Sequence, residues 1–289
     1  MAVLIDENTR LVVQGLTGQQ GRFHSLRNRE AGTRVVAGVT PGKGGQEVEG
    51  IPIFDTVAEA VAETDADASV IYVPARLAAE AILEAADSGV ELVVCVAEGI
   101  PVADMARVAS HIEGRGPVLV GPNCPGLISP GKSNVGIIPY EICKPGRVGL
   151  VSRSGTLTYQ IVHELTQRGI GQSTCIGIGG DPIHGIGFIE ALERFQADPE
   201  TELAVLIGEI GGDDEERAAR FISEHMSKPV VAYIAGFTAP PGKRMGHAGA
   251  IITGSSGTAQ AKAEAFEAVG VKVGRTPTEV AELVEAARA

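Results

Sequence analysis

Short apolar runs alternate with stretches of helical periodicity along the first half of the chain. The apolar runs are rich in β-branched residues and predict strands near residues 11–14, 34–39, 69–73, 92–96 and 118–120. The stretches between them predict helices after Gly21 and over residues 56–64, 77–88 and 102–113. Because a strand buried on both faces is apolar at nearly every position, this alternation predicts βαβ units on a parallel sheet.

The alternation stops at residues 130–146, which are rich in proline and glycine, and then resumes. Further strands are predicted near residues 148–151, 173–178, 203–208, 230–235 and 271–273, with helices beginning near Ser154, Ile186, Asp213, Gly257 and Thr278. We therefore expect an α/β protein with a first domain at residues 1–129, a connection at 130–146 and a second domain at 147–289.

Composition narrows the possible functions. Of the 289 residues 44% are hydrophobic, which is enough for two well-developed cores. A formal charge of 24 minus 36, or −12, argues against nucleic acid or an anionic membrane surface as a partner. The four cysteines lie far apart with no C-x-x-C pair, which is typical of reduced thiols and predicts no metal site. With no signal-type start and no apolar run of membrane length, the sequence predicts a cytoplasmic protein.

A glycine cluster, Gly15 to Gly21, follows the first predicted strand and opens the first helix. That context suits a phosphate at a helix N-terminus, although the spacing G-x-x-G-x-x-G is one residue longer than the dinucleotide fingerprint. Lys43 follows the second strand, where NAD enzymes usually carry an acidic residue. A cation there suits a phosphorylated ribose, so both NADP and the 3′-phospho-ADP of coenzyme A fit this motif.

A second glycine-rich loop holds one histidine, His247, between Gly246 and Gly249. Neutral imidazole can act as a nucleophile or general base near pH 7, and Lys243 and Arg244 upstream favour an anion such as phosphate. Glycine on either side would let the imidazole move. Taken alone, the motif also fits an idle surface histidine.

Two more loops in the second half carry polar groups at strand ends. Ser154, Gly155 and Thr156 begin a predicted helix, where free N–H groups suit a phosphoryl group or ordinary N-capping. Glu209 precedes a double glycine and could hold an imidazole in one tautomer. Because the sequence has no Walker A motif, kinase signature or carboxylate cluster for Mg-ATP, we expect a partner subunit to bind the nucleotide.

These motifs, in this order, resemble the α subunits of succinyl-CoA synthetases (succinate–CoA ligases) over essentially the whole chain. The matching segments are residues 15–21, 39–45, 121–126, 151–159, 177–182, 208–212 and 243–252. The resemblance implies a Rossmann-like CoA-binding domain followed by a flavodoxin-like, doubly wound ligase domain with a transiently phosphorylated histidine. It also implies a β subunit, in an αβ or α2β2 assembly, whose ATP-grasp site binds Mg with ATP or GTP.

The same resemblance assigns roles to individual residues. His247 would be the phosphorylated histidine, Glu209 its carboxylate partner, and Tyr159 would line the succinate site at the β-subunit interface. Phosphate would bind at Ser154, Gly155 and Thr156. Coenzyme A would bind at Thr17, Gly18, Gln19, Gln20, Lys43, Val96, Ala97 and Glu98. In relatives a polar residue is familiar at the first two positions of the loop that ends in Glu98. Here these positions hold Val96 and Ala97, so we expect coenzyme A to contact the backbone there.

The reaction that the resemblance implies has three steps. Succinyl-CoA and phosphate give succinyl phosphate, His247 takes the phosphoryl group, and the loop carries it to the nucleotide on the partner. The alternatives are a related ligase acting on malate or citrate, an NADP-dependent oxidoreductase, and a non-catalytic CoA-binding regulator.

Overall fold

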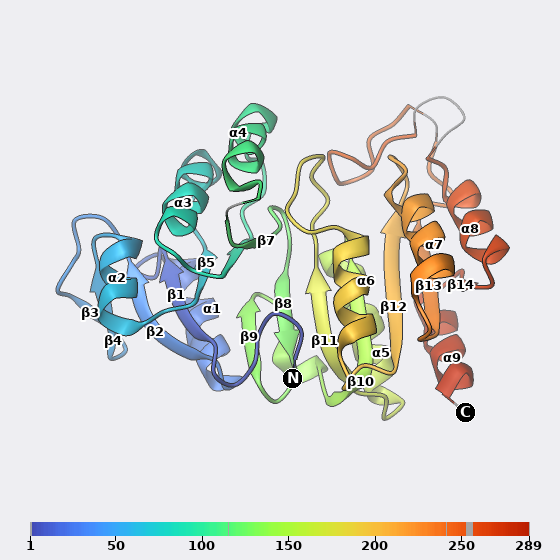
Figure 1. Cartoon of the computed structure of the whole chain (residues 1–289), viewed down its shortest axis with the longest axis horizontal. Coiled ribbons are helices and arrows are strands. Elements are labelled where there is room, and N and C mark those ends of the chain that lie inside the picture. The colour runs from blue at the N-terminus through green and yellow to red at the C-terminus, as the bar shows by residue number, and fades with distance from the viewer. Residues whose placement is uncertain (1, 115, 241, 253–256, 289) are drawn as a thin grey trace. The chain divides into compact units, whose positions relative to one another are not determined.

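The computed structural model describes residues 2–114, 116–240, 242–252 and 257–288. The chain forms two compact units, each an α/β unit with a mainly parallel sheet, as predicted (Figure 1). The N-terminal unit comprises Leu4–Ile138 and Ile183–Gly185, and the C-terminal unit comprises Met1–Val3, Pro139–Pro182 and Ile186–Ala289. None of the described helices is long and apolar enough to cross a membrane.

The sheet of the N-terminal unit has the strand order β3-β4-β2-β1-β5-β6-β7. Its strands are β1 (Arg10–Gln14), β2 (Arg34–Val39), β3 (Glu47–Val48), β4 (Ile51–Phe54), β5 (Ala68–Ile71), β6 (Leu92–Cys95) and β7 (Val118–Val120). Only the pairing of β3 with β4 is antiparallel among them. The order reverses between β1 and β5, which makes this the switch point of a Rossmann-like sheet, where ligands bind beyond the carboxyl ends of the strands.

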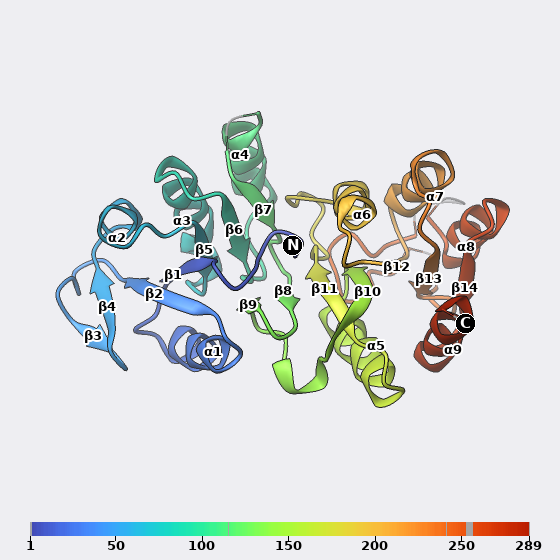
Figure 2. The same ribbon diagram turned by 60° about the horizontal axis from the view of Figure 1, so that its bottom comes forward.

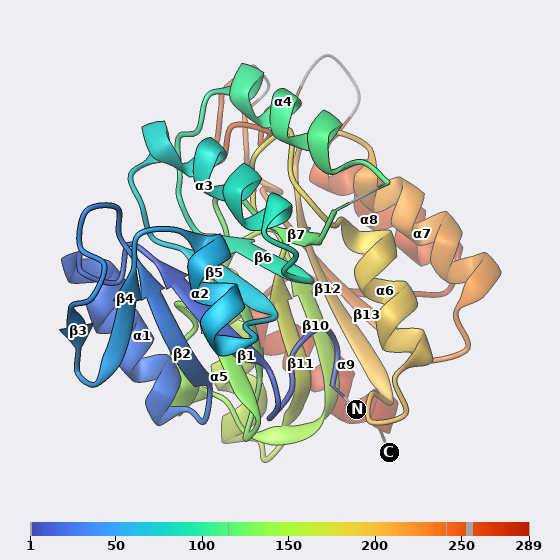
Figure 3. The same cartoon turned by 60° about the vertical axis from the view of Figure 1, so that its left-hand side comes forward.

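Four helices cover the two faces of this sheet. They are α1 (Gln19–Glu30), α2 (Val57–Thr64), α3 (Ala75–Asp87) and α4 (Val102–Ile112). Figures 2 and 3 show α1 on one face and α2 to α4 on the other. On the second face, apolar residues such as Ile71, Ile82 and Met105 pack into a buried cluster between strands and helices. This packing stabilises the sheet whose carboxyl edge carries the glycine cluster.

The segment expected as a connection, residues 130–146, contains regular structure. Strands β8 (Gly126–Ser129) and β9 (Ser133–Gly136) form an antiparallel hairpin, followed by the 3-10 helix η1 (Tyr140–Ile142). The hairpin belongs to the N-terminal unit, where Tyr72 donates its hydroxyl to the Gly136 carbonyl at 2.9 Å. Strands β3, β4, β8 and β9 lie outside the strands predicted from the sequence, because β3 has only two residues and each of the other three contains proline or glycine. The division into domains at 1–129 and 147–289 stays a prediction.

The start of α1 also differs from the expectation. We expected the helix after Gly21, but it begins at Gln19, with Gly18 as an extended N-cap. Gly21 lies within the first turn, where an added Cβ would come 2.2 Å from the Gly15 carbonyl oxygen. Glycine at this position therefore permits the helix to pack closely on the loop, and does not end the loop.

The C-terminal unit contains five parallel strands in the order β14-β13-β12-β10-β11. They are β10 (Pro145–Ser152), β11 (Gln172–Gly177), β12 (Leu203–Glu209), β13 (Val230–Ala235) and β14 (Lys272–Gly274). Numbered along the chain, this is the flavodoxin-like order 2-1-3-4-5, which places the switch point between β10 and β12. Every residue of β11 and β12 is buried, as expected for strands covered on both faces.

Among the described residues, five helices cover this second sheet. They are α5 (Gly155–Gln167), α6 (Phe188–Ala197), α7 (Asp214–His225), α8 (Ala259–Ala268) and α9 (Pro277–Arg288). Figure 2 shows α5 and α9 on one face and α6 to α8 on the other. Because all five strands run in the same direction, the loops that follow them converge at one edge of the sheet.

Candidate functional site

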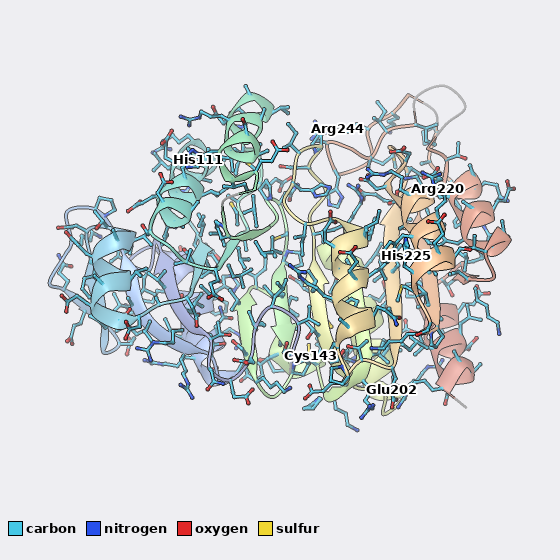
Figure 4. All side chains as sticks on the ribbon, in the orientation of Figure 1. His111, Cys143, Glu202, Arg220, His225 and Arg244 are labelled. Carbon is cyan, nitrogen blue, oxygen red and sulfur yellow. The ribbon has the colours of Figure 1, made fainter. Side chains whose placement is uncertain are left out.

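The carboxyl edge of the C-terminal sheet gathers the polar loops that the sequence singled out. Ser154 follows β10, Gly180 follows β11, Glu209 ends β12, and His247 lies on the long loop after β13. Figure 4 shows Arg244, on the same loop as His247, at the end of the unit opposite Glu202, which precedes β12. The topology of the sheet therefore brings these four loops to one side.

Two backbone hydrogen bonds close the histidine loop. The N–H of Gly242 donates to the Ile252 carbonyl at 3.1 Å, and the N–H of Met245 donates to the Ala250 carbonyl at 2.9 Å. Between them Gly246 has φ +82°, a left-handed value that favours glycine. Gly249 is not in the left-handed region, and its N–H donates to the Gly180 carbonyl at 3.3 Å. The two glycines beside His247 thus have different structural roles.

The imidazole of His247 is held between a carboxylate and a glycine. Its Nδ1 lies 2.7 Å from Oε2 of Glu209, and the two side chains are 23% and 9% exposed. An added Cβ on Gly180 would come 2.1 Å from the imidazole Cγ. The ring therefore packs directly on the Gly180 backbone, and any larger residue there would displace it.

The contact with Glu209 sets the basicity of the ring. The hydrogen bond that the ring donates to Glu209 raises the pKa of His247, while burial and the positive charge of Arg153 oppose this shift. In the tautomer that donates from Nδ1 to the carboxylate, Nε2 carries the free lone pair. The arrangement therefore presents one nitrogen as a nucleophile and uses the other to fix the ring.

The start of α5 follows the strand that lies between the two strands whose ends contact His247, at Glu209 and Gly180. Strand β10 lies between β12 and β11, and the ring touches residues that end β12 and follow β11. Ser154 is the N-cap of α5, and its hydroxyl accepts the N–H of Leu157 at 3.2 Å. The N–H groups of Gly155 and Thr156, in the first turn, have no partner inside a helix. Ordinary capping and an anion-binding helix start are thus both compatible here.

Tyr159 lies one turn further along α5, and its side chain is partly buried. Nothing in the described residues tests its expected role at a substrate site, so that role stays a prediction.

In the N-terminal unit, the side chain of Lys43 contacts the glycine cluster. Its Nζ lies 3.1 Å from the Thr17 hydroxyl, which in turn donates to the Thr40 hydroxyl at 3.1 Å. The first turn of α1 holds no acidic residue, and Gly18 supplies no side-chain cap. Gln19 and Gln20 are exposed at this helix start. The helix start therefore presents N–H groups that have no partner inside a helix next to a cation, which is suitable for phosphate.

A backbone hydrogen bond fixes the loop after β6, which contains residues 96–98. Val96 and Ala97 are half-buried and Glu98 is exposed. The N–H of Asn123 donates to the Ala97 carbonyl at 2.9 Å, which ties this loop to the one after β7. Cys124 is buried, and its thiol donates to the Cys95 carbonyl at 3.3 Å. That contact supports a structural role for Cys124.

Sequence reasoning missed two features of the site. Gly180 lies in the segment 177–182 that carries the family resemblance, and nothing in its sequence neighbourhood signalled that a ring would rest on it. A buried set of charges beneath Glu209, formed by Arg153, Glu215 and Lys262, was also missed. In a helix of mixed polarity such residues resemble ordinary surface charges. Among the described residues, no group of three or more His, Cys, Asp or Glu side chains is arranged to hold a metal ion.

Comparison with known proteins first defines the class. Residues 6–99 match the family model of the CoA binding domain, and residues 151–272 match that of the CoA-ligase family. The protein is therefore a CoA ligase chain with a CoA-binding domain ahead of its ligase domain. The succinate–CoA ligase [ADP-forming] subunit alpha 2 of Archaeoglobus fulgidus is 62% identical over 98% of this chain and 99% of its own length. The corresponding subunit of Aquifex aeolicus is 58% identical, over 98% and 94%. The chain belongs to the family of succinate–CoA ligase α subunits.

Solved structures share the fold over nearly the whole chain. ATP citrate lyase from Methanothrix soehngenii, in complex with citrate and coenzyme A, is 27% identical with a TM-score of 0.85. The match covers 99% of this chain and 50% of that chain, so this chain spans half the length of the lyase. A dinucleotide-forming acetyl-coenzyme A synthetase from Ca. Korarchaeum cryptofilum, at 19% identity, has the same fold with a TM-score of 0.77 over 97% and 61% of the two chains.

Proposed function

We propose that this chain is the α subunit of a succinate–CoA ligase. With a β subunit it would form succinyl-CoA reversibly from succinate and coenzyme A, coupled to cleavage of a nucleoside triphosphate. The observation that carries the proposal is the 2.7 Å contact between His247 Nδ1 and Glu209 at the switch point of the C-terminal sheet. It leaves Nε2 as the nucleophile in a member of this ligase family.

The proposed chemistry moves one phosphoryl group through His247. Phosphate attacks the thioester carbon of succinyl-CoA, and CoA leaves as succinyl phosphate forms. Nε2 of His247 then attacks the phosphorus, and the bond to the succinate oxygen breaks. The phosphoryl group finally passes from Nε2 to a nucleoside diphosphate, which restores the neutral imidazole. Covalent catalysis divides one difficult exchange into easier displacements, and each step can run in reverse.

Glu209 and the start of α5 have complementary roles in this proposal. Glu209 accepts a hydrogen bond from Nδ1–H and stabilises the ring as charge develops on it during attack. The N–H groups of Gly155 and Thr156 would hold the oxygens of the transferred phosphoryl group, with Ser154 capping the helix. These groups are fixed by the fold before reaction, so that little reorganisation is needed.

The N-terminal unit would bind coenzyme A. The match of residues 6–99 to a CoA-binding domain supports coenzyme A in preference to NADP. The first turn of α1, with Thr17, Gly18, Gln19 and Gln20, would receive phosphate oxygens, and Lys43 would contact a ribose phosphate. Val96, Ala97 and Glu98 would line the same carboxyl edge two strands away.

A β subunit would complete the enzyme. The relatives named above are subunits alpha of ADP-forming ligases, which supports ATP as the nucleotide and implies a second kind of chain. We propose that this partner binds the nucleotide with Mg, shares the succinate site near Tyr159, and assembles as αβ or α2β2. The residues described in this chain hold no cluster suited to a metal ion, which is compatible with that division of labour.

Labelling of the histidine tests the proposal. Co-expressed with its β subunit and given ATP labelled at the γ-phosphate, this chain should acquire an acid-labile, base-stable label that succinate and CoA discharge. His247→Asn should abolish the label, whereas His225→Asn, at an exposed histidine on α7, should retain it. Label that persists in His247→Asn would reject the assignment.

Citrate is the second candidate substrate, because a citrate lyase has the same fold over 99% of this chain. The higher identity to succinate–CoA ligase subunits favours succinate. Turnover of succinate, malate and citrate should be compared with the same αβ preparation. A clear preference for malate or citrate would move the protein to another branch of the superfamily while leaving the phosphohistidine in place.

A further inference from the structure

A fully buried ion pair lies beneath the histidine site. Glu215 on α7 and Lys262 on α8 are both 0% exposed, and their side chains are in direct contact. Lys262 Nζ also donates to the Gly211 carbonyl at 2.6 Å and lies 3.8 Å from Oε2 of Glu216. Neither Glu215 nor Lys262 is bonded to the imidazole, but both are bonded to the segment from Glu209 to Gly211, which holds the ring through Glu209.

Glu215 is bonded to the backbone of Glu209. Its Oε1 accepts the Glu209 N–H at 3.1 Å and lies 3.5 Å from Nε of Arg153. The space for this carboxylate comes from Gly208, where an added Cβ would approach the Glu215 Cγ to 2.5 Å. Glu215 thus fixes the last residue of β12, the residue whose own carboxylate holds His247.

Lys262 is bonded to the turn on which the histidine loop rests. The Gly211 carbonyl accepts from Lys262, and the Gly211 N–H donates to the Gly257 carbonyl at 2.8 Å. An added Cβ on Gly211 would come 2.1 Å from the Gly249 carbonyl oxygen, so the turn and the loop are in close contact. Together, Glu215 and Lys262 reach both halves of the site, the carboxylate and the loop.

Stability alone gives a weak reason for this pair. Removing two charges from water costs several kcal/mol per ion, and apolar residues of similar volume are often as stable or more so. Burial raises the pKa of Glu215, which the charges of Lys262 and Arg153 oppose. Because burial of this ion pair is costly, its hydrogen bonds to Glu209 and Gly211 explain its presence better than a contribution to stability does.

We propose that Glu215 and Lys262 are positioning residues that set the location and basicity of the His247 imidazole through Glu209 and Gly211. The consequence for phosphoryl transfer rests on the proposed function of His247. The consequence for the ring itself does not, because it follows from contacts within this chain.

The test compares variants that remove both charges together. In Glu215→Met/Lys262→Met no buried charge of the pair is left alone, so the melting temperature should stay near that of the wild type. The hydrogen bonds to Glu209 N–H and to Gly211 are lost. NMR titration of the full chain, with the His247 signal assigned by its absence in His247→Asn, should show a lowered imidazole pKa. We expect about a tenfold change in the proton-binding constant.

A second variant separates positioning from general disruption. Glu215→Gln/Lys262→Met keeps an oxygen that can accept the Glu209 N–H, and its imidazole pKa should lie closer to the wild type than that of the double-methionine variant. Glu264→Gln, at an exposed residue of α8, is the matched control and should leave the pKa unchanged. If the double-methionine variant does not fold, Glu215→Gln/Lys262→Met provides the comparison with the control, and its imidazole pKa should still fall measurably because the bond from Lys262 to the Gly211 carbonyl is lost.

Phosphorylation in the αβ complex provides a second measurement. Displacing a reacting group by about 1 Å can cost roughly a hundredfold in rate, and we expect a loss of that order in the double-methionine variant. A wild-type imidazole pKa in a folded double-methionine variant would overturn the proposal. If the wild type itself takes no label, the proposed function fails, but the NMR comparison still decides the positioning role.

Discussion

The two glycine-rich loops of the molecule each follow the carboxyl end of a parallel strand, β1 in one unit and β13 in the other, but they are built differently. In the N-terminal unit, the loop from Gly15 to Gly21 is packed against its own helix, with an added Cβ at Gly21 only 2.2 Å from a backbone oxygen. In the C-terminal unit, residues 242–246 of the histidine loop are exposed, and an added Cβ on Gly246 meets nothing within 4 Å. In the first loop glycine permits close packing, whereas in the second it permits an unusual backbone conformation.

This difference matches what each loop is proposed to do. A loop that binds phosphate through its N–H groups must hold them in place, because each displaced donor weakens the site. A loop that carries a phosphoryl group between two sites must be able to leave its resting position. The histidine loop is accordingly held by a few contacts at its base and by the seat of the ring between Glu209 and Gly180.

The largest effect is expected from Gly180→Ala, which removes the seat of the ring. The new methyl group would come 2.1 Å from the imidazole, and the exposed loop can yield more easily than the strand end. We expect phosphorylation of His247 to fall about a hundredfold. CoA binding, measured by calorimetry on the same preparation, should be unchanged. Loss of both activities together would mean that the substitution unfolds the chain.

The converse substitution, Gly21→Ala, should break the first loop and spare the second. The obstructing atom is a backbone oxygen, so the loop or the helix start must shift, at a cost of about 1–3 kcal/mol in unfolding free energy. CoA binding should be lost, while labelling of His247 from ATP should continue in the αβ complex. Denaturant unfolding and the labelling assay measure the two effects. A Gly21→Ala chain that binds CoA normally would contradict the close-packing role.

Many strands, but few of the contacts within the site, could be predicted from the sequence. Strands β2, β7 and β13 have the predicted bounds, because each is a short, mainly apolar run that is rich in valine. The convergence of Glu209 and His247 could be expected, because both follow parallel strands of one sheet. Gly180 under the ring and Lys262 beneath Glu209 could not, because their contacts depend on how loops and helices pack in three dimensions. The roles of these residues in catalysis stay predictions.

A pH profile should sharpen the view that Glu209 controls the ring. Its hydrogen bond raises the pKa of His247, so the neutral nucleophile accumulates only above the usual value near 6.5. The phosphorylation rate of the wild type should therefore rise with pH through a pKa above that value. In Glu209→Gln the rise should move to lower pH, and the rate at high pH should fall about tenfold as the ring loses its anchor. An unshifted profile would remove Glu209 from this role.

The same shift has a sign for stability. A raised pKa means that the folded state binds the proton more tightly than the unfolded state. The contribution of His247 to stability is therefore full below the ordinary pKa and is lost as pH rises through the raised one. Thermal unfolding of the wild type and Glu209→Gln should be measured at several pH values. The difference between their melting temperatures should shrink as pH rises.

The smallest effect separates the two glycines beside His247. Gly246 has φ +82°, so alanine there costs about 1 kcal/mol or more in backbone strain, although its side chain would have open space. Gly249 is outside the left-handed region, and an added Cβ would meet only the Gly180 carbonyl oxygen at 3.5 Å, an ordinary contact.

We expect Gly246→Ala to slow phosphoryl transfer to the nucleotide a few-fold and Gly249→Ala to have little effect, with CoA affinity unchanged in both. Single-turnover discharge of the labelled enzyme measures this step. Equal losses of the transfer rate in the two variants would show that movement of the loop depends on small side chains in general. A loss of CoA affinity that parallels the loss of transfer rate would contradict a carrier role for this loop.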